Sequence, residues 1–379
     1  MHVIVYMVFA LLILWLIMIW PGKGRKERMA VFERQLIAHR GIHNNKGDAP
    51  ENSMAAFRAA VEKGFGIELD IRLTADDQLV VMHDETLKRA AGIDRRVIDM
   101  TWQELKEVKL FKSEEHIPRF SEFLEMAGGQ VPLIVELKCE SRRTVERLCE
   151  NAVFFLDSYD GPACIESFHP MVVRWFKKNR PEILRGQLSE NFSGFKYPKG
   201  FGAFFLSCCA MNFLTRPDFI AYKWKHASYV RFRIFRDLFH TETAGWTFRS
   251  EEDIQKAAGD FDILICEKFT CNLDDPHRKV PERPGRNMKH IIRRYVLVSG
   301  RVTAVGFRYR AVNIAHALGV SGWVRNTDDM RVEMEMQGTP EMLAEMMRRL
   351  GEQRYIEITG TEEREIPPVE SEYEFKVRY

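Results

Sequence analysis

Acidic and basic side chains gather in a few short motifs in the first half of the chain. The motifs are His39-Arg40-Gly41, Pro50-Glu51-Asn52, Glu68-x-Asp70, His83-Asp84 and Glu136-x-Lys138. Residues two apart on a strand point to the same face, so Glu68 pairs with Asp70 and Glu136 with Lys138. Three carboxylates without a thiolate suit a hard cation, Mg2+ or Ca2+. We therefore predict a site for one divalent cation, held by Glu68, Asp70 and Glu136.

The two histidines of these motifs suit proton transfer beside such a cation. Cleaving a phosphodiester removes a proton from the nucleophile and gives one to the leaving alkoxide, and imidazole titrates near neutrality. His39 and His83 are the candidates for this acid/base pair. Arg40 and Lys138 are candidates for holding the anionic phosphate. Each residue alone is better explained as an ordinary polar side chain, but the set together predicts a phosphodiester-cleaving site.

The elements that must position these residues alternate between strand and helix. Short β-rich apolar runs such as LIAHRG, IELDIRLT and PLIVELK are separated by helical patterns. This order predicts a parallel α/β sheet closed into a (β/α)8 TIM barrel, whose carboxyl strand ends surround one mouth. Nine strand candidates compete for eight places. The excess is explained if 67–84 forms a hairpin, with Ala75-Asp76-Asp77 as its turn.

In their order along 36–271, these motifs resemble the glycerophosphodiester phosphodiesterase family, together with SFHP at 167–170 and GWTF at 245–248. The resemblance implies a TIM barrel, a divalent metal, and hydrolysis to glycerol 3-phosphate and an alcohol. It implies metal ligands at Glu68, Asp70 and Glu136, and an acid/base pair at His39 and His83. It also implies a supporting site at Arg40, Glu51 and Lys138. The chain departs from the family near its end, with Glu267 where an aspartate is frequent.

A second domain follows a charged, proline-containing linker at 272–287. The pattern over 288–379 is βαββαβ, a ferredoxin-like α+β arrangement. Its loop 299–308 ends in Gly306, Phe307 and Arg308 before a helix, so backbone amides and arginine form an anion cradle. Asn326 is placed to orient a water. These motifs resemble the acylphosphatase family, which implies catalytic roles for Arg308 and Asn326 and no metal; activity and a purely anion-binding role both remain open.

The first 21 residues predict a membrane anchor. Met1–Trp20 contains no Asp, Glu, Lys or Arg, and about 20 apolar residues span a bilayer. The basic segment 22–34 follows, which predicts a single-pass protein with its catalytic domains in the cytoplasm. A cleaved signal peptide is the alternative, but the apolar run is long and lacks a basic start and a small-x-small cleavage site.

Composition sets the remaining limits. The chain has 379 residues and a formal charge of +2, too little for a nucleic-acid surface, so we expect no nucleic-acid partner. The seven cysteines lack paired metal-site spacing.

The predicted division is anchor 1–21, basic segment 22–34, barrel 35–271, linker 272–287 and second domain 288–379. The predicted substrate is a small glycerophosphodiester or a lysophospholipid. The alternative is an acylphosphatase or phosphate-metabolite sensor with a non-catalytic barrel, and the oligomeric state is left open.

Overall fold

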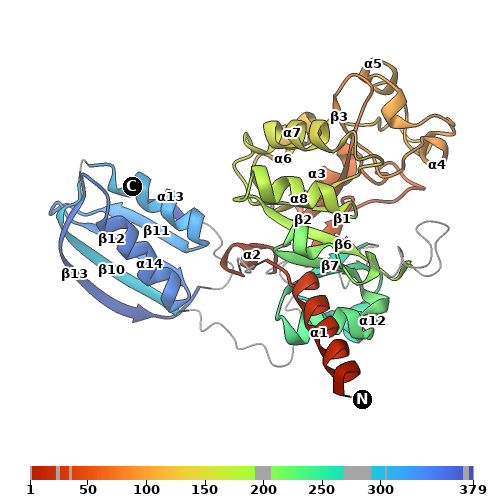
Figure 1. The fold of residues 1–379 in the computed structure, drawn as a ribbon. Helices are drawn as coiled ribbons and strands as arrows, with labels where there is room; N and C mark the ends of the chain where they lie inside the picture. Colours follow the sequence, from red (N-terminus) through yellow and green to blue (C-terminus); the bar gives the residue numbers. More distant parts are fainter. Residues whose placement is uncertain are drawn as a thin grey trace. The chain divides into compact units, whose positions relative to one another are not determined.

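The computed structural model describes residues 2–22, 26–33, 36–192, 206–267, 292–303, 305–369 and 375–378. The chain divides into two compact units (Figure 1). The first comprises Met1–Arg25 and Phe32–Pro284, and the second Lys26–Val31 and Gly285–Tyr379. The predicted linker, 272–287, lies outside the described residues, as do residues 193–205 of the predicted barrel.

The first unit is built on a closed barrel of eight parallel strands with one antiparallel extension. Neighbouring strands pair in the order β1-β9-β8-β7-β6-β5-β4-β2, and pairing of β1 with β2 closes the ring. The barrel strands are β1 (Ile37–His39), β2 (Gly66–Leu73), β4 (Leu133–Leu137), β5 (Ala163–Ser167), β6 (Leu184–Ser189), β7 (Phe219–Lys223), β8 (Glu242–Phe248) and β9 (Ile263–Cys266). This confirms the predicted TIM barrel.

The ninth strand candidate is the second arm of the predicted hairpin. β3 (Leu79–Val81) pairs antiparallel with β2, with Ile71 opposite Val81 and Leu73 opposite Leu79. Thr74 closes the turn, since its hydroxyl donates to Asp76 Oδ1 at 2.7 Å. β3 therefore lies beside β2 outside the closed ring, and the eight places of the barrel are filled by the other eight candidates.

Helices follow the strands and cover the barrel with apolar faces. In the first of them the Ser53 hydroxyl accepts a hydrogen bond from the Ala56 amide at 3.2 Å, and Phe57 is buried. The helices are α3 (Met54–Glu62), α4 (Lys88–Ala91), α5 (Trp102–Leu105), α6 (Phe120–Ala127), α7 (Val145–Leu156), α8 (Pro170–Asn179), α10 (Asn212–Thr215), α11 (Val230–Arg233) and α12 (Glu251–Ala257). Shorter turns are η1 (Val97–Asp99), η3 (Trp224–His226), η4 (Ile234–Leu238) and η5 (Ala258–Asp260).

The strand register decides which side chains face the barrel interior. Register partners on parallel neighbours point the same way, and every second residue of a strand does so too. His39 is opposite Glu68, and Asp70 is opposite Glu136, so these four side chains share one face. The same parity continues around the ring to Trp246. The alternate residues, such as Leu69 and Val135, lie in the apolar core between strands and helices.

The second unit is the predicted ferredoxin-like sheet with one additional edge strand. Its order along the chain is β10 (Ile292–Arg301), α13 (Phe307–Leu318), β11 (Ser321–Asn326), β12 (Val332–Gly338), α14 (Pro340–Gly351), β13 (Glu357–Ile366) and β14 (Phe375–Val377). The sheet order is β13-β10-β12-β11-β14, and β14 runs parallel to β11. Apolar residues of α13 and α14 form its core with the sheet.

Helix α1 (His2–Ile19) belongs to the first unit, and its C-terminal end packs against the core of that unit. Ile19 is buried, its carbonyl accepts from Asn212 Nδ2 at 3.0 Å, and the Trp20 carbonyl accepts from Arg216 at 2.6 Å. In the part of the chain that the structure describes, no helix has both the length and the apolar character needed to cross a membrane. The predicted span over 1–21 thus has no support here. Within 22–34 the chain forms α2 (Lys26–Glu33), a helix that the sequence analysis does not predict.

Candidate active site at the barrel mouth

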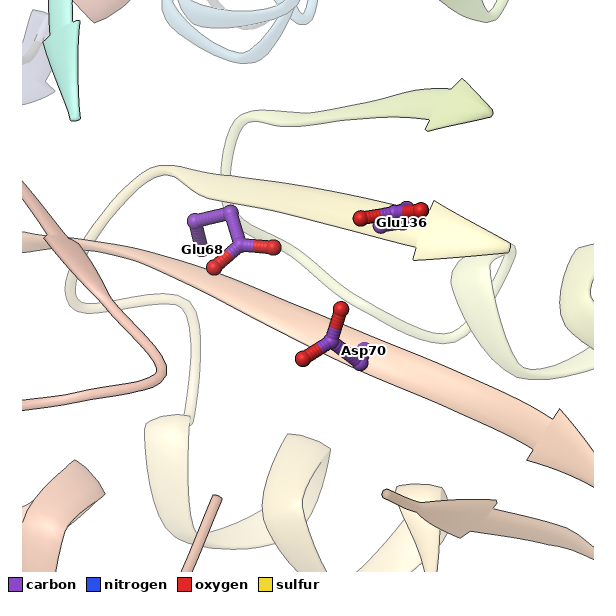
Figure 2. A group of neighbouring side chains, drawn as sticks. All are labelled: Glu68, Asp70 and Glu136. Carbon is purple, nitrogen blue, oxygen red and sulfur yellow. The ribbon is translucent and has the colours of Figure 1, made fainter. Parts of the chain in front are cut away.

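Three buried carboxylates lie together on two neighbouring strands, level with the carboxyl ends of β1 and β4. Glu68 and Asp70 come from β2 and Glu136 from β4 (Figure 2). One oxygen from each lies within 4.8 Å of the others. Their exposed fractions are 2%, 0% and 6%, so water screens them little. The predicted ligand set is therefore assembled by the pairing of β2 with β4.

Two cations and one amide compensate the carboxylates. Arg40 Nε lies 3.1 Å from Asp70 Oδ2, and Lys138 Nζ lies 3.0 Å from Asp70 Oδ1 and 2.7 Å from Glu136 Oε2. Asn52 also donates to Asp70 Oδ2 at 2.9 Å. Burial pushes the pKa of Asp70 up, but Lys138 and Arg40 outweigh it and hold that pKa well below its usual value. Burial raises the pKa of Glu68 and of Glu136.

The arrangement fits a divalent cation. The three carboxylates, when ionised, carry three negative charges, and Arg40 and Lys138 carry two positive charges. The buried cluster therefore keeps one negative charge that these residues do not balance. Glu136 Oε1 is buried and has no hydrogen-bond partner among the described residues, an arrangement that costs free energy unless a ligand meets it. All the candidate ligand atoms are carboxylate oxygens, which suits Mg2+ or Ca2+. A bound dication would leave the site with a net positive charge toward a phosphate.

His39 is oriented by a carboxylate from the last barrel strand. Its Nδ1 lies 2.6 Å from Glu267 Oε1, and Arg249 Nε donates to Glu267 Oε2 at 2.7 Å. Because a carboxylate only accepts, Nδ1 carries the proton and Nε2 keeps its lone pair. Burial, aided by the charge of Arg40, lowers the pKa of His39 to about 4, although Glu267 opposes the shift. His39 is thus a neutral imidazole at neutral pH, with Nε2 available to accept a proton.

His83 has an equivalent partner of its own. Its Nδ1 lies 2.7 Å from Asp84 Oδ1, and Arg89 Nε donates to Asp84 Oδ2 at 2.6 Å. Arg72, inside the hairpin, donates to the His83 carbonyl from Nε at 3.0 Å and from Nη2 at 2.6 Å. His83 and Lys138 also line a cavity of about 500 Å³ beside the triad. Each predicted histidine therefore has a carboxylate partner that an arginine holds in turn.

Glu51 connects the two sides of the site. It accepts from Arg40 Nη1 at 2.7 Å and from Arg89 Nη2 at 2.6 Å. Burial opposes ionisation, but Arg89 and Arg40 prevail and lower the pKa of Glu51 to about 2. Arg40 itself adopts a left-handed φ of 58°, which is uncommon outside glycine, and Gly41 follows with φ 79°. A Cβ on Gly41 would lie 2.8 Å from the Ala56 carbonyl, so the close turn requires glycine there.

The structure brings together all the predicted barrel-site residues, which are His39, Arg40, Glu51, Glu68, Asp70, His83, Glu136 and Lys138. The sequence analysis did not find Arg72, Arg89 and Arg249, the arginines behind the two histidines. They lie outside the motif residues named above, although Arg249 directly follows GWTF, and they reach the site only through folding. The parity of Arg72 with Asp70 on one strand is a signal that could have found that residue.

The second predicted site lies on one edge of the smaller sheet. β10 and β11 both run antiparallel to β12, so their carboxyl ends share an edge, with Asn326 opposite Val332 and Val332 opposite Val298. Gly306 has φ 77° and precedes the first turn of α13, which carries buried Phe307 and Arg308. The loop and Asn326 thus meet at the same edge. Ala304, in the loop before Gly306, lies outside the described residues.

Comparison with known proteins finds a family match in each unit. The sequence model of the glycerophosphoryl diester phosphodiesterase family matches residues 39–233, about half of the chain, and that of the acylphosphatase family matches residues 294–377. The chain therefore belongs to the glycerophosphoryl diester phosphodiesterase family, and its second unit matches the acylphosphatase domain.

Individual relatives match the barrel. A glycerophosphodiester phosphodiesterase of Caldanaerobacter subterraneus is 34% identical over 165 residues, 40% of this chain and 65% of that protein. A human lysophospholipase D is 30% identical over 149 residues, 36% of this chain and 46% of that protein. The matches thus span less than two thirds of these relatives. A structure of an Oleispira antarctica phosphodiesterase in complex with sn-glycerol-3-phosphate aligns with 64% of this chain and 94% of its own chain. The TM-score is 0.50 at 23% sequence identity, which shows that the two proteins share the fold.

We predict that the triad binds Mg2+ or Ca2+ and that each carboxylate is needed. Glu136→Gln keeps the shape of the side chain but removes a charged ligand, so affinity should fall at least tenfold in calorimetric titration of the full chain. Glu166→Gln is the control, because Glu166 is equally buried and opposite Glu136 on β5 but lies outside the triad. Equal losses in the two variants would show that the cation is not held by these three residues.

Proposed function

We propose that the barrel hydrolyses glycerophosphodiesters or lysophospholipids to glycerol 3-phosphate or lysophosphatidate and an alcohol. The observation that carries this is the carboxylate triad flanked by two histidine–carboxylate pairs in one mouth. Glu68, Asp70 and Glu136 would hold the cation, which neutralises phosphate charge and stabilises the charge that develops during displacement. The family membership and the names of the relatives support the same reaction class.

The two histidines take opposite roles in this proposal. Neutral His39 accepts, at Nε2, the proton of the substrate's free glycerol hydroxyl next to the phosphoester, while Glu267 stabilises the imidazolium that forms. His83, with Asp84 behind it, donates a proton to the departing alkoxide. The hydroxyl oxygen bonds to phosphorus as the bond to the alcohol breaks, and water then opens the resulting cyclic phosphate. Arg40 and Lys138 hold the phosphate in place.

Turnover of glycerophosphocholine with Mg2+ or Ca2+ tests this proposal. His39→Ala should lower kcat by at least about 10²-fold, because the general base is lost. Glu267→Gln should also lower kcat, since it leaves the ring present but misoriented. His316→Ala, in the second unit, is the matched control and should keep full activity. Activity that survives a chelator would contradict the metal-assisted route, and an unchanged rate on an analogue without the free hydroxyl would favour direct attack by water.

We propose a second, metal-independent activity in the smaller unit, the hydrolysis of acyl phosphates. Gly306 and the first turn of α13 present backbone amides beside Arg308, and Asn326 lies at the same sheet edge. Arg308 would hold the phosphate, and the Asn326 amide would orient the attacking water. The match to the acylphosphatase domain supports this assignment.

Acetyl phosphate hydrolysis in the presence of a chelator separates this activity from that of the barrel. Arg308→Ala should abolish it, because the phosphate loses its charged partner, while glycerophosphocholine hydrolysis should stay unchanged. Arg310→Ala is the control, since Arg310 lies in the same helical turn and donates to Gln353. If wild-type protein binds phosphate through Arg308 but releases no acetate, the unit is an anion-binding module.

We also propose that residues 1–21 attach the enzyme to a membrane, with both units in the cytoplasm. Large apolar side chains on α1 are exposed, including Tyr6 at 72%, Phe9 at 62% and Leu14 at 53%. The basic segment that follows supports the orientation. Phe9→Asp combined with Leu14→Asp should move the protein from the membrane to the soluble fraction of cells, whereas Phe154→Asp, on α7, should not. Wild-type protein in the soluble fraction, or digestion by protease added outside the cell, would refute this proposal.

A further inference from the structure

The inward ring at the barrel mouth has a second half that the proposed chemistry does not use. The charged half comes from β9, β1, β2 and β4, which are contiguous in the barrel. The other half comes from β5, β6, β7 and β8. Register carries the inward parity from Glu136 to Glu166, then to Gly186, Phe219 and Glu242. Lys223 on β7 and Trp246 on β8 keep this parity. Phe168 and Glu190 directly follow β5 and β6, and they contact Trp246 and Lys223, respectively.

Three aromatic rings occupy this second half. Phe168 lies edge-to-face with Trp246 at 5.8 Å between centroids and with Phe192 at 6.1 Å. All three are half-buried, so they are neither sealed in the core nor fully exposed. Partly exposed rings beside a polar catalytic site offer contact area to an apolar group of a substrate.

Lys223 and Glu190 in this half form an ion pair. Lys223 Nζ lies 2.8 Å from Glu190 Oε2 and 5.7 Å from the centroid of the Trp246 ring. The ammonium of Lys223 thus occupies the position over Trp246 that a cationic head group would take, and it also satisfies the nearby carboxylate. A quaternary ammonium group would have to compete with Lys223, whereas an apolar chain would not.

We propose that Phe168, Phe192 and Trp246 form a subsite for the single acyl chain of a lysophospholipid. This inference rests on the proposed phosphodiesterase function and specifies its substrate class. The phosphate lies at the charged half, and the chain crosses the mouth onto the rings, which removes apolar surface of both from water. The enzyme then prefers a lysophospholipid over the glycerophosphodiester with the same head group.

A pair of substrates that differ only in the acyl chain tests the subsite. Short-chain lysophosphatidylcholine, used as a monomer, is compared with glycerophosphocholine on the full chain. Phe168→Ala and Trp246→Ala should each lower kcat/KM for the lysophospholipid about tenfold or more, mainly through KM, and change it less than about twofold for glycerophosphocholine. Phe154→Ala, which removes an exposed ring from α7, should change neither.

The outcomes separate this inference from the function on which it rests. If wild-type protein cleaves neither substrate with metal present, the proposed function itself fails. If it cleaves both and the two variants lose equally on both, the rings support the fold and not the chain, and the subsite is wrong. A loss confined to glycerophosphocholine and absent with glycerophosphoglycerol would instead assign the rings to a cationic head group and overturn the proposal.

Discussion

The burial of three like charges in one barrel mouth is the constraint on which the rest of the first unit depends. Arg40 and Lys138 offset part of the cost of burying Glu68, Asp70 and Glu136 together. Arg40 reaches that place through a left-handed backbone, and the glycine after it allows the chain to pass close to α3. The motif around Arg40 is therefore required both electrostatically and sterically, and the remaining negative charge suits the mouth to a cation.

The two histidines are built alike although they come from different parts of the fold. In each pair a carboxylate sets the tautomer, and an arginine fixes the carboxylate: Arg249 for Glu267 and Arg89 for Asp84. Such support holds the rings in a reactive orientation before substrate arrives, so less entropy is lost in reaching the transition state. Glu51 joins the side of Arg40 to the side of Arg89, so the two halves of the acid/base machinery share one network.

Each of the two units has an arrangement of residues that suits the recognition of phosphate. The barrel buries a group of acidic side chains. These suit a cation, which would in turn bind an anionic phosphate. The smaller unit points backbone amides at a helix N-terminus, with one arginine beside them, and suits an anion directly. We expect the two sites to respond differently to a chelator, because among the described residues the carboxylates gathered for a metal belong to the first. A single preparation can therefore show which unit performs a given reaction.

The sequence alone determined the fold class, the nine strands of the barrel sheet, the βαββαβ order and the motif residues of both sites. It did so because strand period, turn chemistry and paired charges are local patterns. It did not predict α2, and the membrane span that it predicted over 1–21 is not supported by the structure. Only the tertiary structure decided which arginines stand behind His39 and His83, and that Phe168 and Trp246 share one mouth with Glu68. These contacts join residues far apart in the chain, and barrel closure and strand register, which no local pattern encodes, bring them together.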